Sequence, residues 1–174
     1  PAPLYEQLGR HHHPVTTRSA EAQRYFDQGL LLLFNFNHQE AIRSFRAAAQ
    51  LDPDCAMAYW GEAFAYGPHV NAPMFEEAVA PAWAALQAGL ARRAVASPRE
   101  RDYLDALARR YVAPGQPHDR TVLNQAFADA IGAMPDFPDM LEVVARAREL
   151  DGFAGEHDAQ LAVHLRSRSV AWGV

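Results

Sequence analysis

The hydrophobic pattern of residues 22–53 predicts two amphipathic helices joined by a short polar turn. In both halves, apolar and small residues recur at steps of three and four, which is the spacing of one helix face. They are Tyr25, Phe26, Gly29, Leu32 and Leu33, then Ala41, Ile42, Phe45, Ala48 and Ala49. Ser19 is a good N-cap for a first helix at about Ala20 to Phe34. Asn37, with Glu40 three residues later, predicts a capping box for a second helix that an Asp-Pro pair ends.

The same pattern returns 34 residues further along, which is the mark of a stacked repeat. Tyr25 maps to Tyr59, and Gly29 maps to the small residue Ala63. The further helices that we predict run from about Asp54 to Tyr66 with Asp54 as cap, from Met74 to Ala94, from the pair Ser97-Pro98 to Val112, and from the cap Asp119 onwards, followed by residues 139–152 and 155–172.

These spacings resemble the tetratricopeptide repeat family, whose pattern is an aromatic, Leu-Gly and Tyr on the first helix and Ala, Phe and Pro on the second. The matching residues are Tyr25, Gly29, Ala41, Phe45, Ala48 and Pro53. The chain departs from the pattern at Gln28, where leucine is usual, and at Leu32, where tyrosine is usual. From HHHPVTT to GPHVNAPM it resembles more narrowly a group of bacterial, often exported, repeat proteins of undefined role.

The resemblance implies an all-α fold, built as a right-handed superhelical stack of helix-turn-helix repeats. We expect about three degenerate repeats and a C-terminal helix pair. Residues 1–19 are then an N-terminal arm, and residues 20–174 form the repeat domain.

Composition agrees with helices and excludes several functions. Alanine and leucine dominate the apolar residues, and both are good helix formers. The sixteen basic residues are all arginine and the formal charge is −5, so we expect no nucleic-acid partner, and lysine chemistry is excluded. The apolar runs are too short to span a membrane. The lone Cys55 is expected to be a small buried residue. The opening Pro-Ala-Pro is typical of a chain cleaved after small residues, which favours a periplasmic or extracellular location and leaves a cytoplasmic one open.

The resemblance also implies a non-enzymatic function, in which a concave groove binds a protein or peptide. The groove residues that we predict are Gln28, Leu31, Asn35, Trp60, Glu62 and Tyr66. Trp60 neighbours a core tyrosine and is expected to be exposed as an anchor for the partner. An alternative partner is the chain itself, because a short stack with apolar ends can assemble head to tail into a filament.

A histidine-based metal site is the third hypothesis. His11, His12 and His13 lie in the arm, while His38 and His69 lie in turns that a stack gathers at one edge. Converging imidazoles would bind copper or zinc in a metal carrier or metalloenzyme. The alternative is that the arm histidines are solvated and that the turn histidines cap backbone groups, since the spacing matches no dedicated metal motif.

Overall fold

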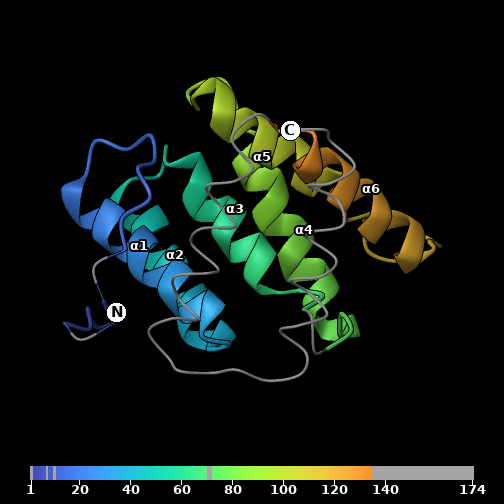
Figure 1. Cartoon of the computed structure of the whole chain (residues 1–174), viewed down its shortest axis with the longest axis horizontal. Coiled ribbons are helices and arrows are strands. Elements are labelled where there is room, and N and C mark those ends of the chain that lie inside the picture. Colours follow the sequence, from blue (N-terminus) through green and yellow to red (C-terminus); the bar gives the residue numbers. More distant parts are fainter. Residues whose placement is uncertain (1, 7, 10, 70–71, 135–174) are drawn as a thin grey trace, which may run out of the picture. The chain divides into compact units, whose positions relative to one another are not determined.

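The computed structural model describes residues 2–6, 8–9, 11–69 and 72–134, and this part of the chain is all-helical, as predicted. Its helices follow one another through short connections (Figure 1). They are α1 (Ala20–Phe34), α2 (His38–Leu51), α3 (Ala56–Ala65), α4 (Glu76–Leu90), α5 (Pro98–Ala108) and α6 (Arg120–Gly132). The two helices predicted within residues 139–172 lie outside the described residues.

Local capping signals fix the starts of three helices. The Ser19 side chain accepts a hydrogen bond from the Ala22 amide at 3.1 Å, so α1 has the predicted bounds. Ser97 and Glu100 form a capping box at the start of α5, and Asp119 caps α6. These caps satisfy N–H groups that have no partner inside the helix.

Two predicted caps are wrong, and in both cases other contacts explain why. Asn37 precedes α2, but its amide donates to Leu32 and its side chain makes no capping bond within the described residues. The predicted capping box is therefore not formed. α3 begins at Ala56 rather than Asp54, since Asp54 lies in the turn before the helix, where its amide donates to Asp52 Oδ1 at 3.2 Å and its carboxylate pairs with Arg18 at 3.0 Å.

The remaining differences concern helix length. α4 is shorter than predicted at both ends and contains Pro81. α5 ends at Ala108, before the predicted Val112. The predicted loop of residues 113–118 is confirmed.

Each helix packs against the next, and α3 also contacts both α1 and α5. In Figure 1, α1 and α2 lie on one side and α6 on the other, with α3, α4 and α5 between them. The odd-numbered helices thus form a row, with α3 between α1 and α5.

A fully buried phenylalanine joins the first three helices. Phe45 of α2 lies with its ring against Gly29 of α1 and Gly61 of α3. A Cβ atom built on either glycine would come within 2.5 Å of the Phe45 ring. The two glycines therefore allow α1 and α3 to approach the same ring.

Two predictions from composition are also tested here. Among the described residues, every helix is too short or too polar to cross a membrane. Cys55 is fully buried, as predicted, and burial raises the pKa of its thiol to about 11.

Candidate functional site

The described parts of the N-terminal segment (residues 2–6, 8–9 and 11–18) make hydrogen bonds with the helices. Gln28 of α1 makes two hydrogen bonds with the backbone of the first part of this segment. The Tyr5 amide donates to Gln28 Oε1 at 2.7 Å, and Gln28 Nε2 donates to the Pro3 carbonyl at 2.8 Å. The Tyr25 hydroxyl donates to the Ala2 carbonyl at 2.8 Å. Gln28, which stands where the repeat pattern has leucine, therefore binds peptide backbone.

Residues 11–18, which we call the bound strand, make further backbone contacts. The His13 amide donates to Asp27 Oδ1 at 3.0 Å and the Val15 amide to Gln23 Oε1 at 2.9 Å, both on α1. α1 therefore accepts hydrogen bonds from three backbone N–H groups of the segment, those of Tyr5, His13 and Val15.

The other edge of the bound strand faces different elements. The Thr16 amide donates to Glu100 Oε1 of α5 at 2.6 Å. The Arg18 amide donates to Asp52 Oδ2, at the end of α2, at 2.8 Å. The strand thus lies between α1 on one edge and α5 with the end of α2 on the other.

Burial along the bound strand alternates from one residue to the next, as expected of an extended chain. The odd-numbered side chains, from His11 to Thr17, are half-buried, and the even-numbered ones are exposed. The His13 ring lies between Phe26 of α1 and Tyr103 of α5, at centroid distances of 6.2 and 6.4 Å. Burial, with the nearby Arg99 charge, lowers the pKa of His13. Burial therefore favours the uncharged form of this packed ring.

Acidic side chains supply most of the acceptors that hold the bound strand. Glu100 is buried and divides its oxygens between the Thr16 amide and the Ser97 amide of its own capping box. Asp52 accepts from the Thr17 hydroxyl at 2.6 Å and from the Arg18 amide. These bonds hold the pKa of Asp52 below its usual range. Carboxylates therefore bind most of the strand amides, while the charge of Arg99 lies near the His13 ring.

Sequence reasoning missed these acceptors, because it treated Asp52 only as part of the Asp-Pro pair that ends a helix and gave no role to Asp27 or Glu100. The available signal was Gln28, a polar residue where the repeat pattern has leucine. It is 5% exposed, and its amide meets both the segment and Ser44.

The predicted groove residues do not form one exposed face. Trp60 is 1% exposed and donates from Nε1 to the Tyr103 carbonyl, so the prediction of an exposed anchor is wrong. Tyr103 covers it from α5, with the two rings 5.6 Å apart. Gln28 and Leu31 are also buried.

The other three predicted groove residues reach the surface. Asn35 is exposed at the end of α1. Glu62 of α3 and Tyr66, which directly follows α3, are half-buried, and both bind Arg46 of α2, at 2.7 and 2.6 Å.

The two turn histidines do meet, as predicted. The His38 and His69 rings stack with centroids 3.5 Å apart and planes 4° apart. Burial and the His38 neighbour lower the pKa of His69 to about 4, and burial lowers that of His38. Imidazole nitrogens coordinate in the ring plane, so parallel rings direct their lone pairs along parallel lines and do not converge on one ion.

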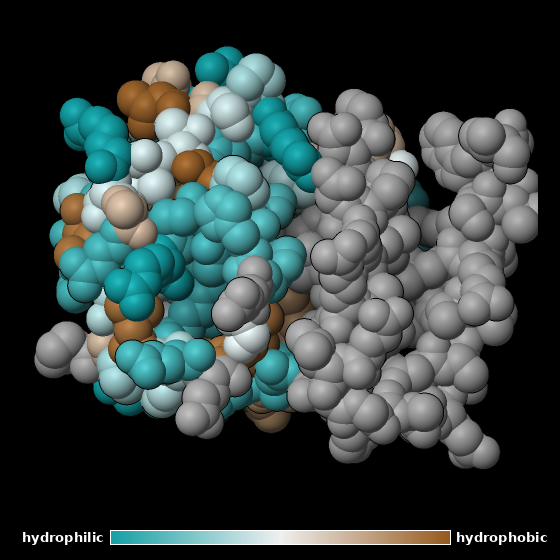
Figure 2. All heavy atoms as spheres, turned by 60° about the vertical axis from the view of Figure 1, so that its left-hand side comes forward, coloured by the Kyte–Doolittle hydropathy of each residue, from teal (hydrophilic) through white to brown (hydrophobic). Residues whose placement is uncertain are grey.

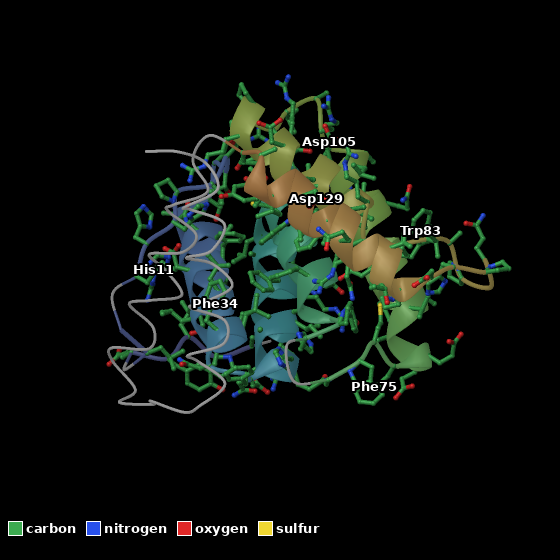
Figure 3. All side chains as sticks on the ribbon, turned by 45° about the vertical axis from the view of Figure 1, so that its right-hand side comes forward. His11, Phe34, Phe75, Trp83, Asp105 and Asp129 are labelled. Carbon is green, nitrogen blue, oxygen red and sulfur yellow. The ribbon has the colours of Figure 1, made fainter. Side chains whose placement is uncertain are left out.

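The arm histidines take part in other contacts. His12 Nδ1 lies 2.8 Å from Asp27 Oδ2. Figure 3 shows His11 on the α1 side, away from Phe75 at the start of α4. Within the described residues there is no group of three His, Cys, Asp or Glu side chains placed to hold a metal ion. The predicted convergence of an arm histidine on His38 and His69 is therefore wrong for this part of the chain.

The surface that Figure 2 shows, on the side of α1 and α2, is mostly hydrophilic with small separate hydrophobic areas. Of the shallow hollows in the described residues, one of about 210 Å³ lies beside Arg43 and Arg46, and one of about 290 Å³ lies beside His118. Both hollows are smaller than most small-molecule pockets, so the contacts between the helices and the bound strand are the clearer binding feature of the described residues.

No family model, curated protein or solved structure matches the chain.

Proposed function

We propose that the chain is a non-enzymatic binding module, built as a TPR-like right-handed stack of helix pairs, which binds an extended peptide segment of a partner protein. The binding surface is formed by α1, α5 and the end of α2. The observation that carries the proposal is that side chains already bind the backbone of an extended strand there.

The packing of the helices supports the architecture. In a stack of helix pairs, each helix contacts the next and the first helices of successive pairs contact one another. The contacts of α3 with α1 and α5 follow this rule. Such a stack offers one continuous row of first helices for a ligand.

The hydrogen bonds support the ligand class. Asp27, Gln23, Glu100 and Asp52 bind amide N–H groups of the bound strand, and such bonds form with any residue except proline. Side chains that bind the backbone while leaving alternate positions to solvent are typical of peptide recognition in an extended conformation.

The test uses a variant in which the bound strand no longer occupies the site, so that a separate peptide can bind there. Replacing Val15 and Thr16 with proline removes two N–H donors and leaves every acceptor in place. We call the full-length double variant Val15→Pro/Thr16→Pro the released variant. Its matched control is Val15→Ala/Thr16→Ala, which keeps both donors. A fluorescein-labelled synthetic peptide of residues 11–18 is the ligand.

We expect the peptide to raise fluorescence anisotropy saturably with the released variant and much less with the alanine control. A peptide with prolines at the same two positions should not bind. If the released variant keeps its helical circular dichroism and still unfolds in one cooperative urea transition yet binds no peptide, the proposed function is wrong.

A further inference from the structure

We infer that the site selects extended, basic segments with a planar ring in the His13 position and that residues 11–18 occlude it until such a segment displaces them. This inference rests on the proposed function and names the ligand class of the same site. It commits to a peptide segment of a partner protein as the displacing ligand.

The order of the hydrogen bonds defines the conformation of the ligand. In an extended chain, N–H groups two residues apart point to the same edge. The amides of His13 and Val15 bind α1, and those of Thr16 and Arg18 bind Glu100 and Asp52 on the other edge. A ligand therefore needs N–H groups at these four positions. Proline fits at position 14, where the chain itself has Pro14.

The inward positions define the side chains. The His13 position lies between Phe26 and Tyr103 and accepts a flat ring. Tyr103 is 1% exposed, and its hydroxyl is buried with no hydrogen-bond partner in the described part of the chain. The Thr17 position places a hydroxyl on Asp52. These contacts favour a ring followed four residues later by a hydroxyl.

The outward positions define the charge. His12 faces Asp27, and the Arg18 guanidinium lies 3.0 Å from Asp54. Carboxylates also accept three of the amides of the bound strand. A ligand with Asp or Glu at positions 12 or 18 would meet like charge, whereas a basic ligand is attracted.

Competition against labelled native peptide on the released variant tests the ligand class. We expect the His13→Ala peptide to bind about tenfold more weakly, because it loses both ring contacts. The peptide with His12→Glu and Arg18→Glu should also bind about tenfold more weakly at low salt, with a smaller loss at high salt. The Pro14→Ala peptide, altered at an outward position, is the control and should bind within about twofold of native.

Occlusion is tested by comparing wild-type protein with the released variant. We expect wild type to bind the native peptide at least about tenfold more weakly, because the attached strand must leave first. Equal binding by the two proteins would overturn the occlusion. If acidic, ringless and native peptides compete equally, the ligand class is wrong while the proposed function stands. If no peptide binds the released variant, the proposed function itself fails.

Discussion

The contact between Phe45 and two glycines predicts that neither glycine can gain a methyl group. In Gly29→Ala or Gly61→Ala, the new Cβ would lie 2.5 Å from the Phe45 ring. The ring is fully buried and also packs on Phe26, with centroids 5.6 Å apart. It has no free volume into which it can move away from either helix.

The expected loss of stability follows from two opposing free-energy terms, helix propensity and overpacking. Alanine favours the helix over glycine by about 1 kcal/mol. Overpacking a buried site costs about 1–3 kcal/mol, and the upper end applies because Phe45 is held on both sides. Each substitution should therefore lower the free energy of unfolding by about 2 kcal/mol. Gly89→Ala is the matched control, since its new Cβ would come closest to the far end of the flexible Leu104 side chain, at 2.9 Å, rather than to a ring.

Urea unfolding followed by circular dichroism measures the effect, provided that the slope with denaturant is unchanged. In a Phe45→Leu background, Gly29→Ala should cost much less, which gives a coupling energy of about 1–2 kcal/mol. If Gly29→Ala and Gly61→Ala cost no more than Gly89→Ala, or if the coupling is absent, the packing argument is refuted.

Three further predictions concern single side chains. Because the pKa of His69 is lowered to about 4, the unfolded chain takes up a proton that the folded chain does not, so stability should fall as pH decreases from 6.5 to 4. Allowing for the partial exposure of the ring, the loss is about 1–2 kcal/mol, and His69→Gln should flatten the pH profile of urea unfolding where His118→Gln does not. Cys55, buried with its pKa raised to about 11, should react with Ellman's reagent at pH 8 only after unfolding, and rapid native labelling would contradict its burial. Phe36 is 59% exposed at φ 60°, so Phe36→Gly should raise the free energy of unfolding by about 1 kcal/mol, while Phe36→Ala, which keeps the strain, should not.

The sequence predicted those parts of the fold that depend on local signals. The bounds of α1 follow from Ser19 and from the hydrophobic period, both of which lie within the helix or beside it. α3 starts two residues later than predicted, and Asp54 lies in the turn before it, with its amide on Asp52 Oδ1. Asp52 is itself bound by Thr17 and Arg18, which lie 35 and 34 residues earlier. A capping rule considers neighbours in sequence and does not detect these contacts.

The site was harder to predict because its partners are far apart in sequence. Thr16 and Glu100 are 84 residues apart, and each is unremarkable alone. Trp60 was misplaced for the same reason, since Tyr103, which covers it, lies 43 residues further on. The pairing of His38 with His69 was predicted because repeat geometry brings successive turns together, whereas ring orientation depends on the details of packing.

The contacts of the bound strand also indicate how a partner could replace it. Two of its four amide bonds, at about 1 kcal/mol each, are enough to lower the open fraction of the site about thirtyfold. A partner makes the same backbone bonds, so it gains nothing over the attached strand from the backbone alone. Its advantage must come from side chains. Arg18 and Asp54, at 86% and 61% side-chain exposure, form an ion pair of small value that a better-placed basic residue could improve. The ring position beside the Tyr103 ring offers a larger gain, since a ligand ring that reaches the buried Tyr103 hydroxyl would add a hydrogen bond that this hydroxyl lacks among the described residues.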